Sequence, residues 1–119
     1  MSRRLPRIDP DTEHAVRLFL ARIAGSYALA GARLYGSRAR GDHDAHSDAD
    51  VAVSLKGART TPSQLLRTKL AMADIAFDVM LETNILISPM PIWDEEWANP
   101  HVYSNPHLLD DIAVEGVAL

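Results

Sequence analysis

The sequence predicts a small α/β fold of the α+β kind, in which helices pack on a mixed β-sheet. Apolar residues recur every three or four positions from Val16 to Tyr27, which is the spacing of a helix with one buried face. From Asp48 to Leu55 the side chains alternate instead between an apolar and a more polar face, as in a half-buried strand. The chain has 119 residues, so we expect these elements to form one domain.

The composition excludes several classes of protein. There is no cysteine, so disulfide frameworks, zinc–thiolate sites and cysteine nucleophiles are absent. The net charge of −4 argues against direct nucleic-acid binding, which usually requires a basic face. The start of the chain, residues 1–7, is basic but no apolar stretch follows it, and no later run is long enough to span a membrane. We therefore expect a cytoplasmic protein without a membrane segment.

The first half of the chain is expected to hold one helix and two strands. Asp9 is a typical helix-capping residue, and Pro10 is favoured in the first turn of a helix. The expected elements are, in order, a helix from about Asp9 to Gly25, a strand in the second half of residues 28–35, a loop over residues 36–47 with one helical turn at 37–40, and a strand over residues 48–55.

The second half is expected to alternate helices and strands. The expected elements are a helix that opens at Thr61-Pro62 with Leu65, Leu66, Leu70 and Ala73 facing inward, a strand from Ile75 to Leu81, a strand from Ile85 to Ile92, and a helix from Pro106 to Glu115. Pro89 and Pro91 cannot donate backbone hydrogen bonds, so their strand belongs at a sheet edge. Trp93 and Trp97 are interpreted as packing a C-terminal tail, residues 93–119, against a core of residues 10–92.

Three acidic residues are the candidate catalytic centre. Asp48 and Asp50 are two positions apart on one strand, so their side chains leave the same face. Asp78 would join them if the strand expected over residues 75–81 were a neighbour, with Asp74 and Glu82 as rival third acids. Converging carboxylates repel one another, and a magnesium ion relieves that repulsion. The residues alone therefore predict a Mg²⁺ site.

Two loop features could complete such a site. Gly36-Ser37 follows a strand and opens a possible helical turn, where glycine allows close approach of a ligand and exposed amides attract phosphate. His43 and His46 could instead bind a transition metal, although two histidines in a loop are more often solvated. The phosphate interpretation is favoured because the Gly-Ser pair lies close to the two aspartates in the sequence.

The chain resembles the minimal nucleotidyltransferases of the polymerase-beta-like nucleotidyltransferase superfamily. Gly36-Ser37, ten further residues and then Asp48-Ala49-Asp50 match their signature, and the resemblance covers about residues 28–82. It implies the nucleotidyltransferase fold, with Asp48, Asp50 and Asp78 as catalytic metal ligands for Mg²⁺. It also implies that Gly36 and Ser37 hold the phosphates of ATP, with Arg38 or Arg40 near the leaving pyrophosphate.

Proteins of this kind are typically encoded beside a HEPN-domain toxin. The resemblance implies an antitoxin that transfers AMP from ATP to a tyrosine of that HEPN partner, and hence a hetero-oligomer with it. Two other hypotheses remain open, namely transfer to a small molecule such as an aminoglycoside, and an antitoxin that works by binding and occlusion alone. The intact acid trio argues against occlusion, because a protein that only binds has no need to concentrate repelling carboxylates.

Overall fold

The computed structural model describes residues 8–103 and 105–119, so the basic segment of residues 1–7 lies outside the described residues. The elements are α1 (Pro10–Ile23), β1 (Leu29–Tyr35), α2 (Ser37–Arg40), β2 (Ala49–Leu55), α3 (Gln64–Thr83), β3 (Ile87–Trp93), α4 (Asp94–Ala98), a 3₁₀ turn (Pro100–Val102), α5 (Pro106–Glu115) and β4 (Val117–Ala118). Within the described ranges, no helix is both long and apolar enough to cross a bilayer.

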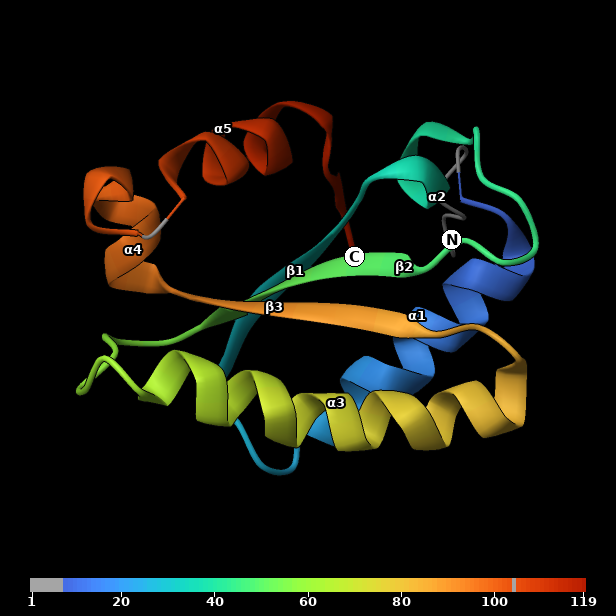
Figure 1. The fold of residues 1–119 in the computed structure, drawn as a ribbon, viewed down its shortest axis with the longest axis horizontal. Helices are drawn as coiled ribbons and strands as arrows, with labels where there is room; N and C mark the ends of the chain where they lie inside the picture. Colours follow the sequence, from blue (N-terminus) through green and yellow to red (C-terminus); the bar gives the residue numbers. More distant parts are fainter. Residues whose placement is uncertain (1–7, 104) are drawn as a thin grey trace, which may run out of the picture.

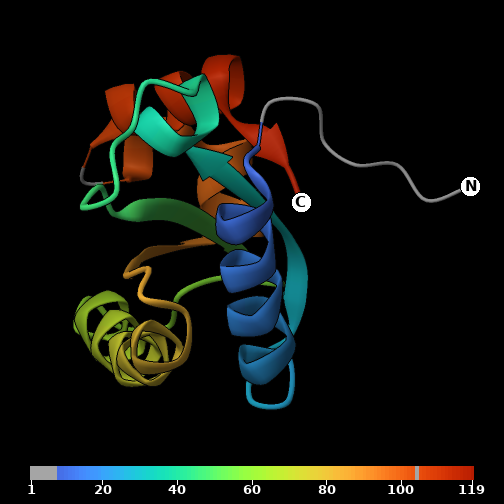
Figure 2. The ribbon, with the colours of Figure 1, turned by 90° about the vertical axis from the view of Figure 1, so that its right-hand side faces the viewer.

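A four-stranded mixed sheet forms the centre of the fold, with the strand order β3-β2-β1-β4. β1 pairs antiparallel with both β2 and β4, whereas β2 and β3 run parallel. Helices α1 and α3 cover one face of the sheet, and α4 and α5 lie over the other (Figures 1 and 2). The predicted α/β fold with a mixed sheet packed by helices is therefore confirmed.

Each face of the sheet has its own apolar core. Val51, Val53 and Leu55 of β2 point toward α1 and α3 and are buried there, as their alternation predicts. Ala52 points the other way and packs in a smaller cluster with Ile92 and with residues of α5. Because side chains alternate along a strand, Asp50 and Ser54 share the face of Ala52, which is the face under α4 and α5.

Helix α3 corrects the prediction for the second half of the chain. The segment Ile75–Leu81, expected as a strand, is the C-terminal part of a 20-residue helix. Between Gln64 and Asn84 there is no glycine or proline, so nothing interrupts the helix before Asn84 ends it in a left-handed conformation with φ of 63°. Asp78 consequently lies on a helix and not on a strand of the sheet.

The buried face of α3 also differs from the prediction. The residues that pack inward are Thr68, Met72, Ala76 and Val79. Of the four residues expected to face inward, Leu65 is half-buried against the core as predicted. The other three are exposed, with Leu66 at 60%, Leu70 at 57%, and Ala73 also exposed. The sequence contains two apolar stripes on this helix, and hydrophobicity alone did not indicate which one faces the sheet.

Several other expectations are confirmed. Asp9 caps α1, since its carboxylate accepts a hydrogen bond from the amide of Thr12 at 3.0 Å. β3 lies at a sheet edge and pairs only with β2, so the missing N–H groups of Pro89 and Pro91 cost no ladder hydrogen bonds. Trp93 is buried, and Trp97 donates from Nε1 to the Ser54 hydroxyl at 2.9 Å, so both tryptophans pack the tail down.

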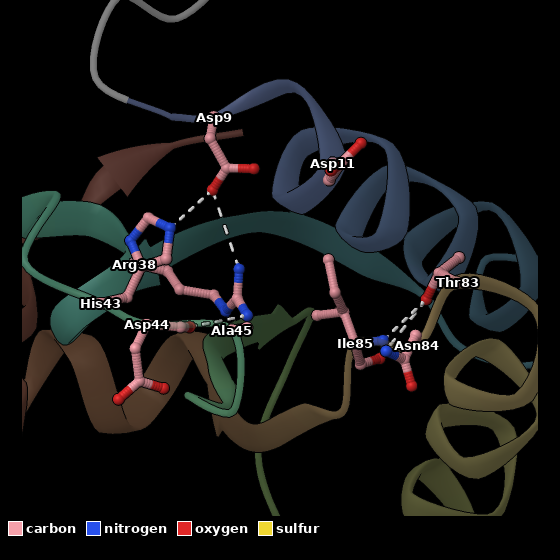
Figure 3. Close-up of a pocket in the computed structure, with 9 residues that line it drawn as sticks. All are labelled: Asp9, Asp11, Arg38, His43, Asp44, Ala45, Thr83, Asn84 and Ile85. Carbon is pink, nitrogen blue, oxygen red and sulfur yellow. Dashed lines mark hydrogen bonds and ion pairs between the residues drawn. The ribbon is translucent and has the colours of Figure 1, made fainter.

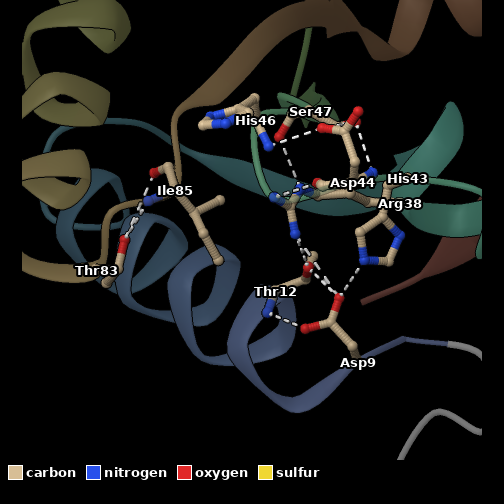
Figure 4. Close-up of polar contacts among 9 residues, drawn as sticks. All are labelled: Asp9, Thr12, Arg38, His43, Asp44, His46, Ser47, Thr83 and Ile85. Atoms are coloured by element: carbon tan, nitrogen blue, oxygen red, sulfur yellow. Dashed lines mark hydrogen bonds and ion pairs between the residues drawn. The ribbon is translucent and has the colours of Figure 1, made fainter.

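Arg38 of α2 joins the start of α1 to the loop that leads into β2. Its side chain is 4% exposed and points away from the sheet toward the N-terminus of α1 (Figures 3 and 4). Nη1 donates to the Thr12 hydroxyl at 2.7 Å and lies 3.7 Å from the Asp9 carboxylate. Nε donates to the carbonyl of Ser47 at 2.8 Å, and Nη2 to that of Asp44 at 3.4 Å. The guanidinium therefore fixes the loop directly before Asp48.

We predict that Arg38→Ala lowers the free energy of unfolding by about 2–3 kcal/mol, because it removes charge-assisted hydrogen bonds from a buried position. Urea unfolding followed by circular dichroism measures this. Arg17→Ala is the matched control, since Arg17 pairs with Glu13 on the exposed side of α1, and it should change stability by less than about 0.5 kcal/mol. Equal effects of the two substitutions would contradict the role given to Arg38.

Candidate active site

Asp50 occupies the middle of the sheet, with a neighbour on each side. In the antiparallel ladder it pairs with Tyr35 of β1, and in the parallel ladder with Ser88 of β3. Asp48 lies directly before β2 and is exposed, and the amide of Ala49 donates to the carbonyl of Leu86 at 2.9 Å. The two aspartates are thus held at the start of a paired strand.

Gly36 lies directly against Asp50. Its φ of +76° is in a region that side chains other than glycine rarely adopt, and a Cβ at this position would collide with the Asp50 carboxylate oxygen Oδ2. Ser37 follows as the first residue of the predicted turn α2, and it is half-buried. The sequence proximity of Gly36-Ser37 to the aspartates therefore corresponds to direct contact between glycine backbone and carboxylate.

The electrostatics of the site disfavour its empty, fully ionised state. Burial raises the pKa of Asp50, the negative charge of Asp48 raises it further, and Arg40 partly offsets both effects. Burial also raises the pKa of Tyr35 to about 12, with a further contribution from Asp50, so this phenol stays protonated at neutral pH. A cation beside Asp48 and Asp50 would relieve their repulsion.

The two candidate arginines have different surroundings. The buried guanidinium of Arg38 is engaged with α1 and the loop, which is a structural role that the sequence interpretation missed. Arg40 is 48% exposed and forms ion pairs with Asp42 at 3.2 Å and Glu115 at 3.4 Å. Because Arg40 is close enough to affect the pKa of Asp50, it is the better placed of the two for a phosphate at the site.

Asp78 does not converge with the other two acids. Helix α3 covers the face of the sheet opposite to the one that bears Asp50. Asp78 is exposed on that helix and contributes to the charge environment of Arg22, whose guanidinium pairs with Glu82. Asp74, the other rival, is likewise exposed on α3. The expectation of a third carboxylate from residues 75–81 rested on the incorrect strand.

Ser88 occupies the place where a third strand-borne acid would lie. It is the parallel register partner of Asp50 on β3 and therefore projects from the same face. In the part of the chain that the structure describes, no group of three or more acids or histidines is arranged to hold a metal ion. This also excludes His43 and His46 as members of such a group; the Nε2 of His43 instead pairs with the Asp9 carboxylate at 2.9 Å.

Two carboxylates still fit a magnesium–nucleotide complex. Mg²⁺ is commonly held by one or two protein carboxylates, with substrate phosphates and water completing its shell. Asp48 and Asp50 supply the carboxylates, and the absence of a side chain at Gly36 lets the Gly36-Ser37 turn lie directly against Asp50. The site is therefore suited to a divalent ion that arrives with a nucleotide rather than to one held by the protein alone.

Two hollows flank the loop before β2. The larger, about 350 Å³, is lined by Arg38, His43 and the start of α1, and neither Asp48 nor Asp50 borders it (Figure 3). The other, about 310 Å³, is lined by Asp48, His46 and residues near the end of α3, including Met80 and Asn84. Only the second gives a substrate access to a candidate metal ligand.

We predict that Ser88→Asp creates a stronger metal site. In a chelator the third carboxylate should lower the melting temperature, because three like charges then share one face. Added Mg²⁺ at about ten times its Kd should restore about 1.4 kcal/mol. Thermal unfolding with and without Mg²⁺ measures both effects, and Ser88→Asn is the uncharged control. A Mg²⁺ response in Ser88→Asp no larger than that of the control would show that position 88 does not face the site.

We predict that Asp50→Asn stabilises the metal-free fold at neutral pH. The pKa of Asp50 is higher in the folded than in the unfolded state, so between these two pKa values the folded state binds more protons. The free energy of unfolding therefore falls as the pH rises from the unfolded-state pKa to the folded-state pKa. The asparagine variant lacks this loss. Urea unfolding in chelator should show it more stable than the parent at pH 7, with the difference closing below about pH 4. A difference in stability between the variant and the parent that does not change with pH would show that it does not come from the raised pKa of Asp50.

A protein-family model matches the part of the chain that carries the candidate site. The family model described as polymerase beta, nucleotidyltransferase matches residues 20–90, a segment that runs from α1 to β3 and contains the Gly-Ser turn and both aspartates. No curated protein matches the chain. A crystal structure of a "putative nucleotidyltransferase" from Sulfolobus solfataricus is similar, with 18% identity, a TM-score of 0.48, and coverage of 97% of this chain and 90% of that one. The chain belongs to the polymerase beta nucleotidyltransferase family.

Proposed function

We propose that this nucleotidyltransferase transfers AMP from ATP to a tyrosine hydroxyl of a HEPN-type toxin and so acts as its antitoxin. The observation that carries the catalytic part is the contact between the Gly36 backbone and the Asp50 carboxylate. It puts a turn suited to phosphate directly beside a carboxylate suited to a metal ion. The toxin partner and the choice of ATP come from the resemblance to minimal nucleotidyltransferases.

The reaction would form one bond and break one. The acceptor oxygen attacks the α-phosphorus of ATP, the bond from that phosphorus to the bridging oxygen breaks, and pyrophosphate leaves. A bound Mg²⁺ would neutralise charge on the phosphates. Asp48 and Asp50 would hold that ion, while Ser37 and Arg40 would orient the β- and γ-phosphates. Asp48, exposed and bordering a hollow, is the residue best placed to accept the proton of the acceptor hydroxyl.

A protein acceptor suits the architecture. The hollow beside Asp48 is open, and it is formed by the loop before β2 and by the end of α3. A small molecule such as an aminoglycoside would need further contacts to be oriented, whereas a folded partner brings its own binding surface. The charge of the chain, −4, also favours a protein over a nucleic acid as the bound macromolecule.

Neutralisation by occlusion is the second candidate, and one observation favours it. The argument against it required three converging carboxylates, but Ser88 stands beside Asp50 and Asp78 lies on the other side of the sheet. A site with two acids can bind a magnesium–nucleotide complex and still transfer slowly. The two candidates therefore differ in whether transfer is needed for neutralisation.

We predict that intact-mass spectrometry of the chain with ATP, Mg²⁺ and the HEPN-type partner shows the partner gaining mass in steps of one AMP. Asp48→Asn and Asp50→Asn should each slow the transfer by at least about a hundredfold, the scale seen when a key charge-stabilising group is lost. Asp78→Asn is the matched control and should transfer at the parental rate, because Asp78 is exposed on α3.

Two results would change the proposed function or its catalytic residues. A partner that stays unmodified with each of the four nucleoside triphosphates, yet is neutralised equally by the parent and by the Asp48→Asn, Asp50→Asn double variant, would establish occlusion. Loss of transfer in Asp78→Asn alone would mean that the catalytic carboxylates are not Asp48 and Asp50.

A further inference from the structure

Helix α3 carries an exposed apolar stripe that the nucleotidyltransferase site does not use. Leu66, Leu70, Phe77 and Leu81 are 60%, 57%, 52% and 68% exposed, and the small, exposed Ala73 lies between them. Their spacing of four, seven and four residues aligns them on one side of the helix. Contiguous exposed apolar side chains of this kind mark interaction surfaces more often than isolated ones do.

The stripe faces away from the rest of the molecule. The opposite side of α3 holds Thr68, Met72, Ala76 and Val79, which pack against the sheet and α1. Figures 1 and 2 show α3 at the outer boundary of the fold, with no element on its far side. The stripe therefore contributes nothing to the core of the single chain.

The positions of the large apolar residues in the stripe are symmetric about its midpoint. Leu66 and Leu81 are equally far from the midpoint between residues 73 and 74, and so are Leu70 and Phe77. If a second α3 were laid antiparallel over this midpoint, Leu66 of each copy would meet Leu81 of the other, and Leu70 would meet Phe77. Such a surface is complementary to itself, which is the property that a twofold interface requires.

The charged residues beside the stripe also favour antiparallel pairing, because the two halves of the helix carry opposite charges. The exposed Arg67 lies in the first half of the stripe, whereas the exposed acids Asp74 and Asp78 lie in its second half and Glu82 directly follows it. Arg67 and Asp78 are eleven residues apart, close to three whole turns, so they lie on the same flank. Antiparallel pairing places Arg67 of one copy two residues from the level of Asp78 in the other, whereas parallel pairing would place like charges side by side.

We propose that the chain forms a twofold-symmetric homodimer through antiparallel packing of α3 on α3. The interface is the stripe Leu66, Leu70, Ala73, Phe77 and Leu81, flanked by two equivalent Arg67–Asp78 pairs. Because α3 lies on the face of the sheet away from Asp50, the dimer leaves the Asp50 carboxylate uncovered.

Asp74 gives the proposed interface a distinctive weakness. It lies next to the twofold axis, on the same flank as Arg67, so the two copies of Asp74 approach each other. Like charges in such positions are unfavourable. The proposal therefore requires that Asp74→Asn strengthen the dimer.

The oligomeric state of the 119-residue chain tests the proposal. Sedimentation equilibrium should give twice the 13.1 kDa chain mass, with Kd below about 100 μM. Leu70→Glu and Phe77→Glu should each weaken the dimer at least about tenfold, as loss of a central apolar contact does. Val114→Glu is the matched control, since Val114 is 87% exposed on α5 away from the stripe, and it should leave Kd unchanged. Circular dichroism verifies that each variant is folded.

A charge exchange tests the pairing. Arg67→Glu should weaken the dimer, because acidic side chains then face each other across the interface. The weakening should be larger at low salt, where this repulsion is less screened. Combining it with Asp78→Arg in the same chain should restore Kd, since each copy then offers the reversed pair. Failure of the double variant to recover would remove the Arg67–Asp78 pair from the interface.

The orientation can be read by disulfide cross-linking, because the chain has no native cysteine. Ala73→Cys lies at the axis and should cross-link to itself. Leu66→Cys should not, since its two copies are offset by fifteen residues, about 22 Å along the helix. An equimolar mixture of Leu66→Cys and Leu81→Cys should cross-link as a heterodimer.

Three results would overturn the proposal. A monomer at about 100 μM would do so, as would a dimer unaffected by Leu70→Glu and Phe77→Glu. Efficient self-cross-linking of Leu66→Cys would reject the antiparallel arrangement. If the chain is monomeric but Leu70→Glu abolishes binding to the HEPN-type partner, the stripe belongs to that partner instead.

Discussion

The parallel pairing of β2 with β3 is the constraint on which the rest of the structure depends. Parallel neighbours cannot be joined by a tight turn, so the chain must cross the sheet and return, and a helix is the usual connection. Helix α3 spans most of residues 56–86 between the two strands. The same pairing brings Ser88 beside Asp50 and places α3, with Asp78, on the opposite face.

The sequence was most informative where local signals and burial agreed. Asp9 before Pro10, the alternation of Val51, Val53 and Leu55, and the prolines of the edge strand each predicted an element that the structure contains. Residues 75–81 misled because Ile75, Phe77, Val79 and Leu81 also alternate like a strand. The lack of any helix breaker before Asn84 was the stronger signal, since a helix that has begun continues unless something stops it.

In the candidate site, too, the residues signalled by local sequence were predicted and those that depend on tertiary structure were missed. Gly36-Ser37, Asp48 and Asp50 were predicted from local spacing, and the structure places Gly36 in contact with Asp50. Tyr35 and Ser88 were missed, because their place beside Asp50 depends on strand register, which the sequence did not indicate. Arg38 was given a phosphate role from its position after the Gly-Ser pair, whereas its buried guanidinium instead holds the loop before Asp48.

The two faces of the sheet therefore differ in what they present. One face bears Asp50 between Tyr35 and Ser88, where burial and a neighbouring charge disfavour the ionised carboxylate until a cation binds. The other face is covered by α1 and α3, and the outer side of α3 presents an apolar stripe. A small chain has little surface to spare, so catalysis and association can be altered independently only if they occupy opposite faces. An assembly through α3 would leave the face that bears Asp50 uncovered, whereas one across α5 would obstruct that face.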